Sequence, residues 1–329
     1  MWFVWLLLGV VVTYNTLFKR FVQSFRLPNG EGKAVVITGC DTGFGRQLAL
    51  RCARFGFLCF AGCFSKESCE SLEKEAAGAE LRAFELDVRS EESVAGALRF
   101  VRERLGDRRL HALVNNAGVP GVYAPIVWCP TAVFEQTLAV NFFGIVRMVE
   151  AFGSLIREHR GRIVNMGSVN GKIAVPFTAP YCASKTALNG YTDCLRRELR
   201  PFGVSVVLVE PSFYKTPLMA LAPLRRRLHE LFERLPVGEQ RVYGREYVDF
   251  LEAKIEDVDA NFSSPAIHEV VDAQFDALVQ HWPEPRSHPG LSGKLLFVPA
   301  QFLSTHFQDL LYAALELLGP QPPVVKKVE

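Results

Sequence analysis

The feature that most constrains the fold is a β-branched run that ends directly in a glycine-rich turn. The run Ala34–Thr38 reads AVVIT, and Gly39, Gly43 and Gly45 follow it before an amphipathic stretch from about 46 to 55. This order of strand, turn and helix is typical of dinucleotide-binding βαβ units, because glycines let the backbone approach a pyrophosphate and the helix N-terminus supplies amides. A lone glycine-rich loop can also be only a tight turn, so the rest of the chain must decide.

After this loop, short apolar runs alternate with helix-length amphipathic segments. Further strands are predicted over 57–62, 81–86, 112–114, 162–166 and 204–209. A helix-length segment separates each strand from the next, which predicts an α/β fold with a single Rossmann-type, doubly wound parallel sheet.

Beyond Pro211 the alternation stops. Helices are predicted over 221–235 and 246–257, and proline-rich loops then precede an apolar stretch over 295–318. We expect this part to be a C-terminal helical cap over the strand ends, where a substrate would lie. The predicted organisation is a membrane anchor over 1–18, a linker over 19–32, a dinucleotide-binding and catalytic core over 33–219, and over 220–329 the substrate cap, the apolar segment and a tail.

The first 18 residues, Met1 to Phe18, contain no charged side chain. They are about as long as the shortest membrane-spanning helices, roughly 17 residues. A cleaved signal peptide would have a basic start and small residues at a cleavage site, which are missing. Trp2 and Trp5 suit an interfacial aromatic belt, so we predict a retained anchor rather than a buried core helix. The first basic residues are Lys19, Arg20 and Arg26.

Composition argues against nucleic acid and metal as partners. The net charge is only +2 over 329 residues, and the basic residues are spread along the chain. The cysteines show no C-x-x-C spacing and no histidine pair at zinc-finger distance, which predicts buried thiols rather than a metal site or a disulfide framework. They are Cys40, Cys52, Cys59, Cys63, Cys69, Cys129, Cys182 and Cys194.

Two further turns lie at predicted strand ends on the glycine-loop edge. Asn115, Asn116, Ala117 and Gly118 close the fourth strand, where a turn of small residues can approach a ribose. Asp87 closes the third strand, where its carboxylate could accept from an adenine amino group.

A possible acid/base group lies in the segment YCASK. Tyr181 and Lys185 are spaced i and i+4, which places them on one helix face, and Ser168 follows the fifth strand. A nearby ammonium favours the phenolate and should lower the pKa of the phenol, so Tyr181 could exchange a proton with a substrate oxygen. Ser168 would hold that oxygen by a hydrogen bond. Standing alone, a Tyr–Lys pair at this spacing would be read as an exposed surface pair.

Together these residues resemble the short-chain dehydrogenase/reductase superfamily, which combines the loop T-G-x-x-x-G-x-G, the turn N-N-A-G, a catalytic Ser and Y-x-x-x-K. The similarity covers about 33–219. The loop TGCDTGFG, the segment EPSFYKTP over 210–217 and the segment KLLFVPA from Lys294 are similar to the membrane-bound retinol and 17β-hydroxysteroid dehydrogenases.

The resemblance implies a hydride transfer between a nicotinamide cofactor and an alcohol or carbonyl, with Asn141, Ser168, Tyr181 and Lys185 as catalytic residues. Asn141 would hold a water in the proton relay, and Lys185 would also bind the nicotinamide ribose. The cofactor-binding residues expected from motifs and resemblance are Thr38, Gly39, Asp41, Gly43, Phe44, Gly45, Asp87, Asn115, Ala117, Gly118, Tyr181, Lys185, Pro211 and Thr216.

One residue departs from the family pattern. The family usually has glycine where this chain has Ser212, in the turn after the sixth strand. If that position needs a positive φ, serine is strained there, and replacing it by glycine should raise stability or cofactor affinity.

The resemblance implies NAD or NADP as the cofactor. NAD enzymes commonly place an acid after the second strand and NADP enzymes a basic residue, whereas here the segment reads GCFSK, with Lys66 as a possible phosphate partner or a solvated side chain. Because Thr42 in the glycine loop is not basic, and because similar enzymes mostly use NAD, we favour NAD.

The apolar termini favour a large apolar substrate, a retinol or a hydroxysteroid. Another lipid carbonyl, or a hydroxy acid such as hydroxybutyrate, is the alternative within this enzyme class. A catalytically silent membrane scaffold is the alternative outside it, and the complete catalytic set argues against that. A homodimer is possible.

The basic residues that follow the predicted anchor, Lys19, Arg20 and Arg26, predict an endoplasmic-reticulum membrane protein with a cytosolic catalytic domain. Lys326 and Lys327 resemble a dilysine retrieval signal, which works from the cytosolic side, although they could also belong to a solvated tail. Some similar retinol dehydrogenases are thought to face the lumen. Asn261 begins an N-x-S sequence that only a lumenal enzyme would use for glycosylation.

Overall fold

The structure is a computed structural model of the 329-residue chain. It describes residues 21–323 and, before them, only positions 2, 5, 9, 10, 13 and 17. The predicted anchor and the lysines at 326 and 327 therefore lie mostly or wholly outside the described residues.

A parallel sheet organises the described part of the chain, with strand order β3-β2-β1-β4-β5-β6-β7. Its central strands are buried on both faces, as Val35, Val36 and Ile37 illustrate with exposed fractions of 0%. Continuous apolar runs of this kind suit a parallel sheet that helices cover on both sides. The strands are β1 (Lys33–Thr38), β2 (Leu58–Cys63), β3 (Leu81–Glu85), β4 (Arg109–Asn115), β5 (Arg162–Met166), β6 (Ser205–Val209) and β7 (Arg286–Ser287).

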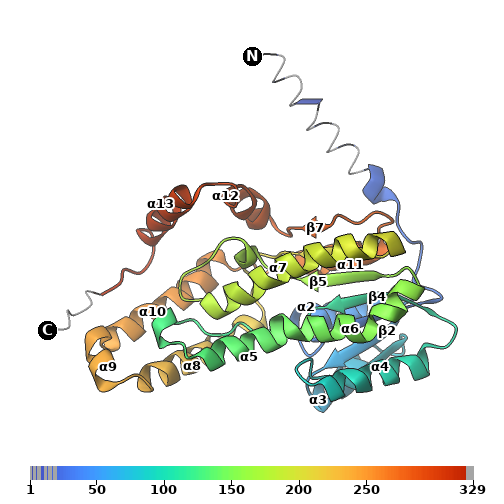
Figure 1. Ribbon diagram of the computed structural model, residues 1–329, viewed down its shortest axis with the longest axis horizontal. Helices are drawn as coiled ribbons and strands as arrows, with labels where there is room; N and C mark the ends of the chain where they lie inside the picture. Colours follow the sequence, from blue (N-terminus) through green and yellow to red (C-terminus); the bar gives the residue numbers. More distant parts are fainter. Residues whose placement is uncertain are drawn as a thin grey trace.

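Helices cover both faces of the sheet (Figure 1), and the sheet separates two apolar cores. The first face carries α2 (Gly43–Arg54), α3 (Lys66–Glu75) and α11 (His268–Val279). The second carries α4 (Glu91–Leu105), α5 (Thr131–Asn141), α6 (Phe143–Glu158) and α7 (Ala179–Leu199). The predicted doubly wound α/β fold is thus confirmed, and the crossover order brings the ends of β1, β4 and β5 together at one edge.

The C-terminal third adds helices beyond the strand ends, at the left and top of Figure 1. They are α8 (Leu221–Glu233), α9 (Val237–Tyr243), α10 (Arg245–Asp257), α12 (Val298–Ala300) and α13 (Thr305–Glu316). A third apolar core joins α8 and α10 to Trp128, Val122 and Ala124 from the region after β4. The cap helices α8 and α10 therefore pack directly against the segment that follows β4.

Among the described residues, one helical stretch, Thr131–Glu158, is long and apolar enough to cross a membrane by length and composition. It comprises α5 and α6, and these helices contact β4, α4 and α7. Because α5 and α6 pack against the sheet and its helices, we assign this stretch to the helical layer on one face of the sheet.

Candidate active site

The glycine loop closes against the turn after β4. A Cβ atom at Gly39 would lie 2.7 Å from Cα of Ala117, and one at Gly45 would lie 2.3 Å from the carbonyl oxygen of Gly39. The Thr38 hydroxyl accepts hydrogen bonds from the amides of Asn116 (3.1 Å) and Ala117 (3.0 Å). No side chain fits at Gly39 or Gly45 without a shift of backbone, so this edge of the sheet keeps an uncovered main-chain surface.

The N-terminus of α2 fits a pyrophosphate. Thr42 is the N-cap residue and makes no side-chain capping hydrogen bond, and the first turn contains no acidic residue. Its amides and the positive end of the helix dipole are therefore free to meet an anion.

Asp41 spans from the glycine loop to the end of β2. Its carboxylate accepts hydrogen bonds from the amide of Phe64 at 2.9 Å and from the amide of Ser65 at 3.2 Å. A negative charge is thereby fixed beside the residues that follow β2, where the sequence has no acid of its own. Lys66 begins α3 and is exposed, and it does not line the cavity described below.

The predicted acid/base residues come together on α7 and at the end of β5. Lys185 is buried, and its ammonium donates a 2.8 Å hydrogen bond to the carbonyl of Met166. Ser168 is the N-cap residue of a 3-10 turn, Val169–Gly171, and its hydroxyl accepts from the amide of Asn170 at 3.2 Å. Tyr181 is partly exposed and lines the same cavity as Ser168 and Lys185.

Burial dominates the protonation of this group. It raises the pKa of Tyr181 to about 12, although a hydrogen bond from Ser168 acts in the opposite direction. It also lowers the pKa of Lys185 to about 8. The expectation that Lys185 brings the phenol pKa down is therefore wrong for the protein alone, because desolvation is the largest cause of the shift and raises the pKa.

A cavity of about 460 Å³ unites these parts. Eleven of the fourteen predicted cofactor-binding residues line it, and so does Ser168. Thr38, Gly45, Asn115 and Asn141 do not line it. Asn115 is buried and donates to Asn165 at 2.9 Å, so these four residues support the cavity wall from behind.

Comparison with known proteins identifies the family. The model of the short chain dehydrogenase family matches residues 33–225. The chain belongs to this family. It is thus an NAD(P)-dependent oxidoreductase that acts on CH–OH groups.

Several relatives of this short-chain dehydrogenase cover almost its whole length. A 3beta-hydroxysteroid dehydrogenase of Caenorhabditis elegans is 38% identical over 95% of this chain and 82% of its own. Retinol dehydrogenase 5 of Mus musculus is 36% identical over 96% and 97%. Human 17-beta-hydroxysteroid dehydrogenase type 6 is 32% identical over 93% and 96%. The predicted resemblance to retinol and hydroxysteroid dehydrogenases is confirmed.

Solved structures show the same fold. A short chain dehydrogenase/reductase from Burkholderia phymatum in complex with NAD superposes with a TM-score of 0.66 at 24% identity, covering 91% of this chain and 100% of that one. An actinorhodin polyketide ketoreductase with NADPH gives 0.63 at 25% identity, over 80% and 97%.

In this short-chain dehydrogenase the side chain of Asn141 makes three hydrogen bonds. Its amide donates to the carbonyl of Val119 at 2.9 Å and to the hydroxyl of Ser184 at 3.1 Å, and its oxygen accepts from the amide of Val119 at 2.8 Å. Asn141 ends α5, and Phe142 breaks the helix before α6 begins. The role of Asn141 in holding a water of the proton relay stays a prediction, because its side-chain oxygen accepts one hydrogen bond and has a second acceptor position.

The turn after β6 corrects the expectation for Ser212. Within the described residues, the non-glycine residues with positive φ are Ala77, Arg160 and Phe177, so Ser212 is not strained in this way. Its hydroxyl instead bonds the hydroxyl of Ser292 at 2.8 Å. Glycine is not required at this position, and the serine ties the turn to the C-terminal segment.

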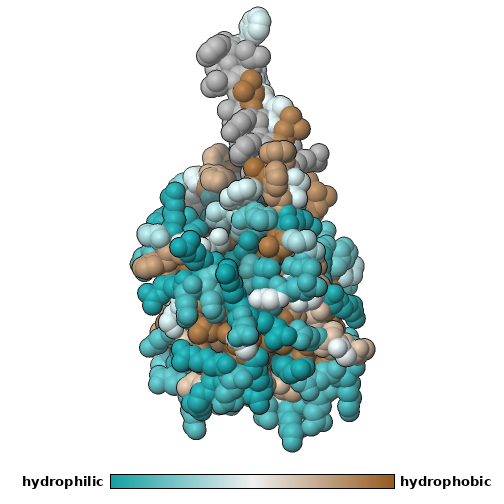
Figure 2. Space-filling view, turned by 90° about the vertical axis from the view of Figure 1, so that its right-hand side faces the viewer, coloured by the Kyte–Doolittle hydropathy of each residue, from teal (hydrophilic) through white to brown (hydrophobic). Residues whose placement is uncertain are grey.

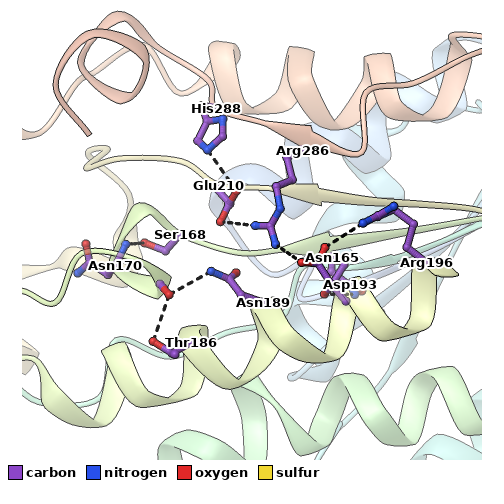
Figure 3. A network of polar contacts seen from close by, with 12 residues as sticks. Asn165, Ser168, Asn170, Thr186, Asn189, Asp193, Arg196, Glu210, Arg286 and His288 are labelled. Carbon is purple, nitrogen blue, oxygen red and sulfur yellow. Dashed lines mark hydrogen bonds and ion pairs between the residues drawn. The ribbon is translucent and has the colours of Figure 1, made fainter. Parts of the chain in front are cut away.

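A buried ion-pair network holds the same turn (Figure 3). Glu210, 1% exposed, is paired with Arg286 at 3.0 Å and with His288 at 3.2 Å. Arg286 also pairs with Asp193 of α7 at 3.0 Å. Burial alone would raise the pKa of Glu210, but the hydrogen bond from His288 and the charge of Arg286 hold it below the usual range. Glu210, which directly precedes Pro211, is therefore held in place by Arg286 of β7 and by His288.

Two cavity residues, Asn116 and Asn170, were not among the predicted site residues. Asn116 donates to the carbonyls of Thr38 at 3.0 Å and Gly39 at 3.1 Å, and thereby holds the glycine loop. Asn170 is 4% exposed, and its side-chain oxygen has no partner among the described residues. Asn116 belongs to the N-N-A-G turn that we predict to lie near the ribose, whereas nothing in the sequence marks Asn170.

Proposed function

We propose that this enzyme interconverts the alcohol and the carbonyl of a large apolar substrate, a hydroxysteroid or a retinol, and that it prefers NAD. The proposal of an apolar substrate rests on the distribution of charged residues in the cavity. Of the cavity-lining residues only four are charged, namely Asp41, Asp87, Arg89 and Lys185.

Three of these charged residues, Asp41, Asp87 and Arg89, follow β1 and β3, whereas Lys185 belongs to the reacting centre. Asp41 is held at the end of β2, and Asp87 accepts from Arg89 at 2.7 Å. The cap side is lined by apolar side chains, including Leu218, Met219, Leu224 and Ile255. A hydroxy acid would bring a carboxylate into this apolar wall without a partner, which is costly. The observation therefore favours an apolar alcohol over hydroxybutyrate.

The residues at the reacting centre divide the work. When bound, the nicotinamide supplies or accepts the hydride. Ser168 donates a hydrogen bond to the substrate oxygen and fixes its position. Tyr181 gives a proton to that oxygen in the direction of reduction and takes one in the direction of oxidation. Lys185, held by Met166, places a positive charge beside the phenol. A scaffold without turnover would not need a buried lysine in this place.

The preference for NAD rests on Asp41. Its carboxylate stands at the end of β2 and supplies the acid that the segment after that strand lacks. Such an acid can accept from a ribose 2′-hydroxyl and repels a 2′-phosphate. The relatives' names, which include a 3beta-hydroxysteroid dehydrogenase and a retinol dehydrogenase, support the substrate class.

The deciding experiment is a substrate panel on the membrane-embedded enzyme. Hydroxysteroids, retinols and 3-hydroxybutyrate are each offered with NAD and with NADP, and absorbance is followed at 340 nm. Turnover with an apolar alcohol and NAD supports the proposal. Turnover with hydroxybutyrate alone, or cofactor binding without turnover on any alcohol, contradicts it.

We also propose that the protein resides in the endoplasmic-reticulum membrane with the catalytic domain in the cytosol.

A further inference from the structure

The cavity contains a buried carboxamide whose oxygen has no partner. Asn170 is 4% exposed and lines the cavity, and among the described residues nothing bonds its Oδ1. Its main-chain amide has a separate task, because it donates to the Ser168 hydroxyl at 3.2 Å. In Figure 3 the carboxamide of Asn170 points away from Ser168. Because buried polar groups in proteins are normally hydrogen-bonded, an unpaired one that lines a ligand cavity points to a bond with the ligand.

The turn that carries Asn170 is held firmly on the catalytic helix. The carbonyl of Gly171 accepts from Thr186 at 3.2 Å and from Asn189 at 3.1 Å, both on α7. A Cβ atom at Gly171 would lie 2.8 Å from the carbonyl oxygen of Lys185, so the turn packs directly on that helix. The carboxamide is therefore fixed relative to the acid/base pair, as a group that orients a substrate must be.

Other polar side chains of the cavity already have partners in the protein. Thr178 donates to the carbonyl of Val175 at 2.8 Å, and Tyr214 donates to Glu269 at 2.9 Å. The carboxamide of Asn170 differs from these hydroxyls because its oxygen is still free to accept. A carboxamide also carries two donors, so it is able to bond either a hydroxyl or a carbonyl group.

The cap side of the cavity is apolar, with Leu218, Met219 and Leu224 among its lining residues. In contrast, Figure 2 shows a mostly hydrophilic surface on the end of the molecule away from the cap helices. An apolar alcohol that is held at Ser168 and extends along this wall displaces water from the cavity. If the alcohol has one oxygen only, Asn170 is left against hydrocarbon, at a cost that a second oxygen removes.

We infer that Asn170 is a specificity-determining residue whose carboxamide bonds a second oxygen of the substrate. The inference rests on the proposed function and narrows the substrate class. Alcohols that carry a further hydroxyl or carbonyl, as many hydroxysteroids do, are favoured over alcohols with a single oxygen, such as retinol. A site that bonds a substrate hydroxyl rejects an analogue without that hydroxyl much more strongly than an apolar pocket rejects a change of size.

Kinetics with matched substrates test this inference on the membrane-embedded enzyme. The substrates are androstanediol, the two androstanols that each lack one of its hydroxyls, and retinol. Asn170→Leu replaces the carboxamide by an apolar group of similar shape and keeps the main-chain amide that bonds Ser168. We expect the ratio of kcat/KM for the diol to kcat/KM for the better androstanol to fall by about tenfold in the variant, as for the loss of one buried hydrogen bond. The value for retinol should stay the same or rise.

A second variant separates recognition from packing. Met219→Leu changes the apolar wall at nearly constant volume and should affect the diol and the androstanols alike. Equal losses on the diol and the androstanols in Asn170→Leu, or no loss on either, would overturn the inference while the proposed function stands. If the wild-type enzyme turns over neither the steroids nor retinol, the proposed function fails and the inference fails with it.

Discussion

The ammonium of Lys185 lies 5.5 Å from the centre of the Tyr181 ring. One helical turn of α7 separates the two residues, and both line the cavity that Ser168 enters from β5. Burial raises the pKa of Tyr181 and lowers the pKa of Lys185, so it favours the uncharged form of both groups.

Replacing Tyr181 by phenylalanine removes only the hydroxyl. We expect turnover to fall by roughly a hundredfold or more, since a positioned acid/base group is lost, while cofactor affinity and the free energy of unfolding stay near the wild-type values. Steady-state kinetics, cofactor titration and thermal unfolding measure the three quantities. Wild-type turnover in the variant would reject the assigned role.

Replacing Lys185 by methionine should lower turnover and change the pH dependence of stability. In the folded protein the lysine pKa is lowered to about 8, whereas the unfolded chain keeps about 10.4. Between these values the unfolded state binds more protons, so the wild-type protein gains stability as the pH rises from about 8 to about 10. The variant should lack this gain. Thermal unfolding of both proteins from pH 6 to pH 10 makes the comparison, and parallel curves would refute it.

Replacing Asp41 by asparagine tests cofactor choice. The amide oxygen can still accept from the amides of Phe64 and Ser65, so the loop should keep its place while the charge is removed. We expect kcat/KM with NADP relative to NAD to rise by about tenfold or more, which corresponds to about 1.4 kcal/mol. Glu75→Gln, which removes a nearby surface ion pair with Arg46, is the control. An unchanged ratio would show that Asp41 does not discriminate.

Replacing Ser212 by glycine now has an expected result opposite to the one that the family pattern suggested. The variant loses the 2.8 Å hydrogen bond to Ser292 and gains backbone freedom in the unfolded chain. We expect a loss of stability of about 1 kcal/mol and weaker cofactor binding. Ser292→Ala should behave alike, and a double variant should add little to either single one. A stabilised glycine variant would restore the strain argument.

Glycosylation reports the membrane orientation. Asn261 is exposed and its amide donates to Asp257 at 2.7 Å. With the catalytic domain in the cytosol, glycosidase treatment of the cell-made protein should leave its gel mobility unchanged. A faster band that disappears in Asn261→Gln would show a lumenal enzyme.

The sequence predicted the sheet well, because each strand is a local apolar run. The fifth strand matches at both ends, 162–166, and most others agree within one residue. The fourth starts at Arg109, earlier than 112, because its first residues alternate polar and apolar. The two-residue β7 was missed, since it has no run of its own and exists only through its pairing with β6.

The site was predictable where a motif encodes a local shape. Gly39 and the pair Tyr181 and Lys185 are of this kind. The position of Asp41 was not, because its partners at Phe64 and Ser65 come from another strand end. The pKa of Tyr181 was misjudged for a similar reason. The spacing of Tyr181 and Lys185 can be read from the sequence, but the desolvation that raises the pKa of Tyr181 depends on the packed cavity.

The contact between Glu210 and Arg286 limits how this protein can be divided. A chimera that ends the catalytic core near residue 225, where the family match stops, would leave the carboxylate of Glu210 buried without its cation. An unpaired buried charge commonly costs 3–5 kcal/mol, a large part of the stability of a typical domain. A grafted cap would therefore have to bring its own arginine in register with β6. Shortened forms of the chain should accumulate poorly in cells, and exchange of substrate specificity between relatives should succeed only when the last strand travels with the cap.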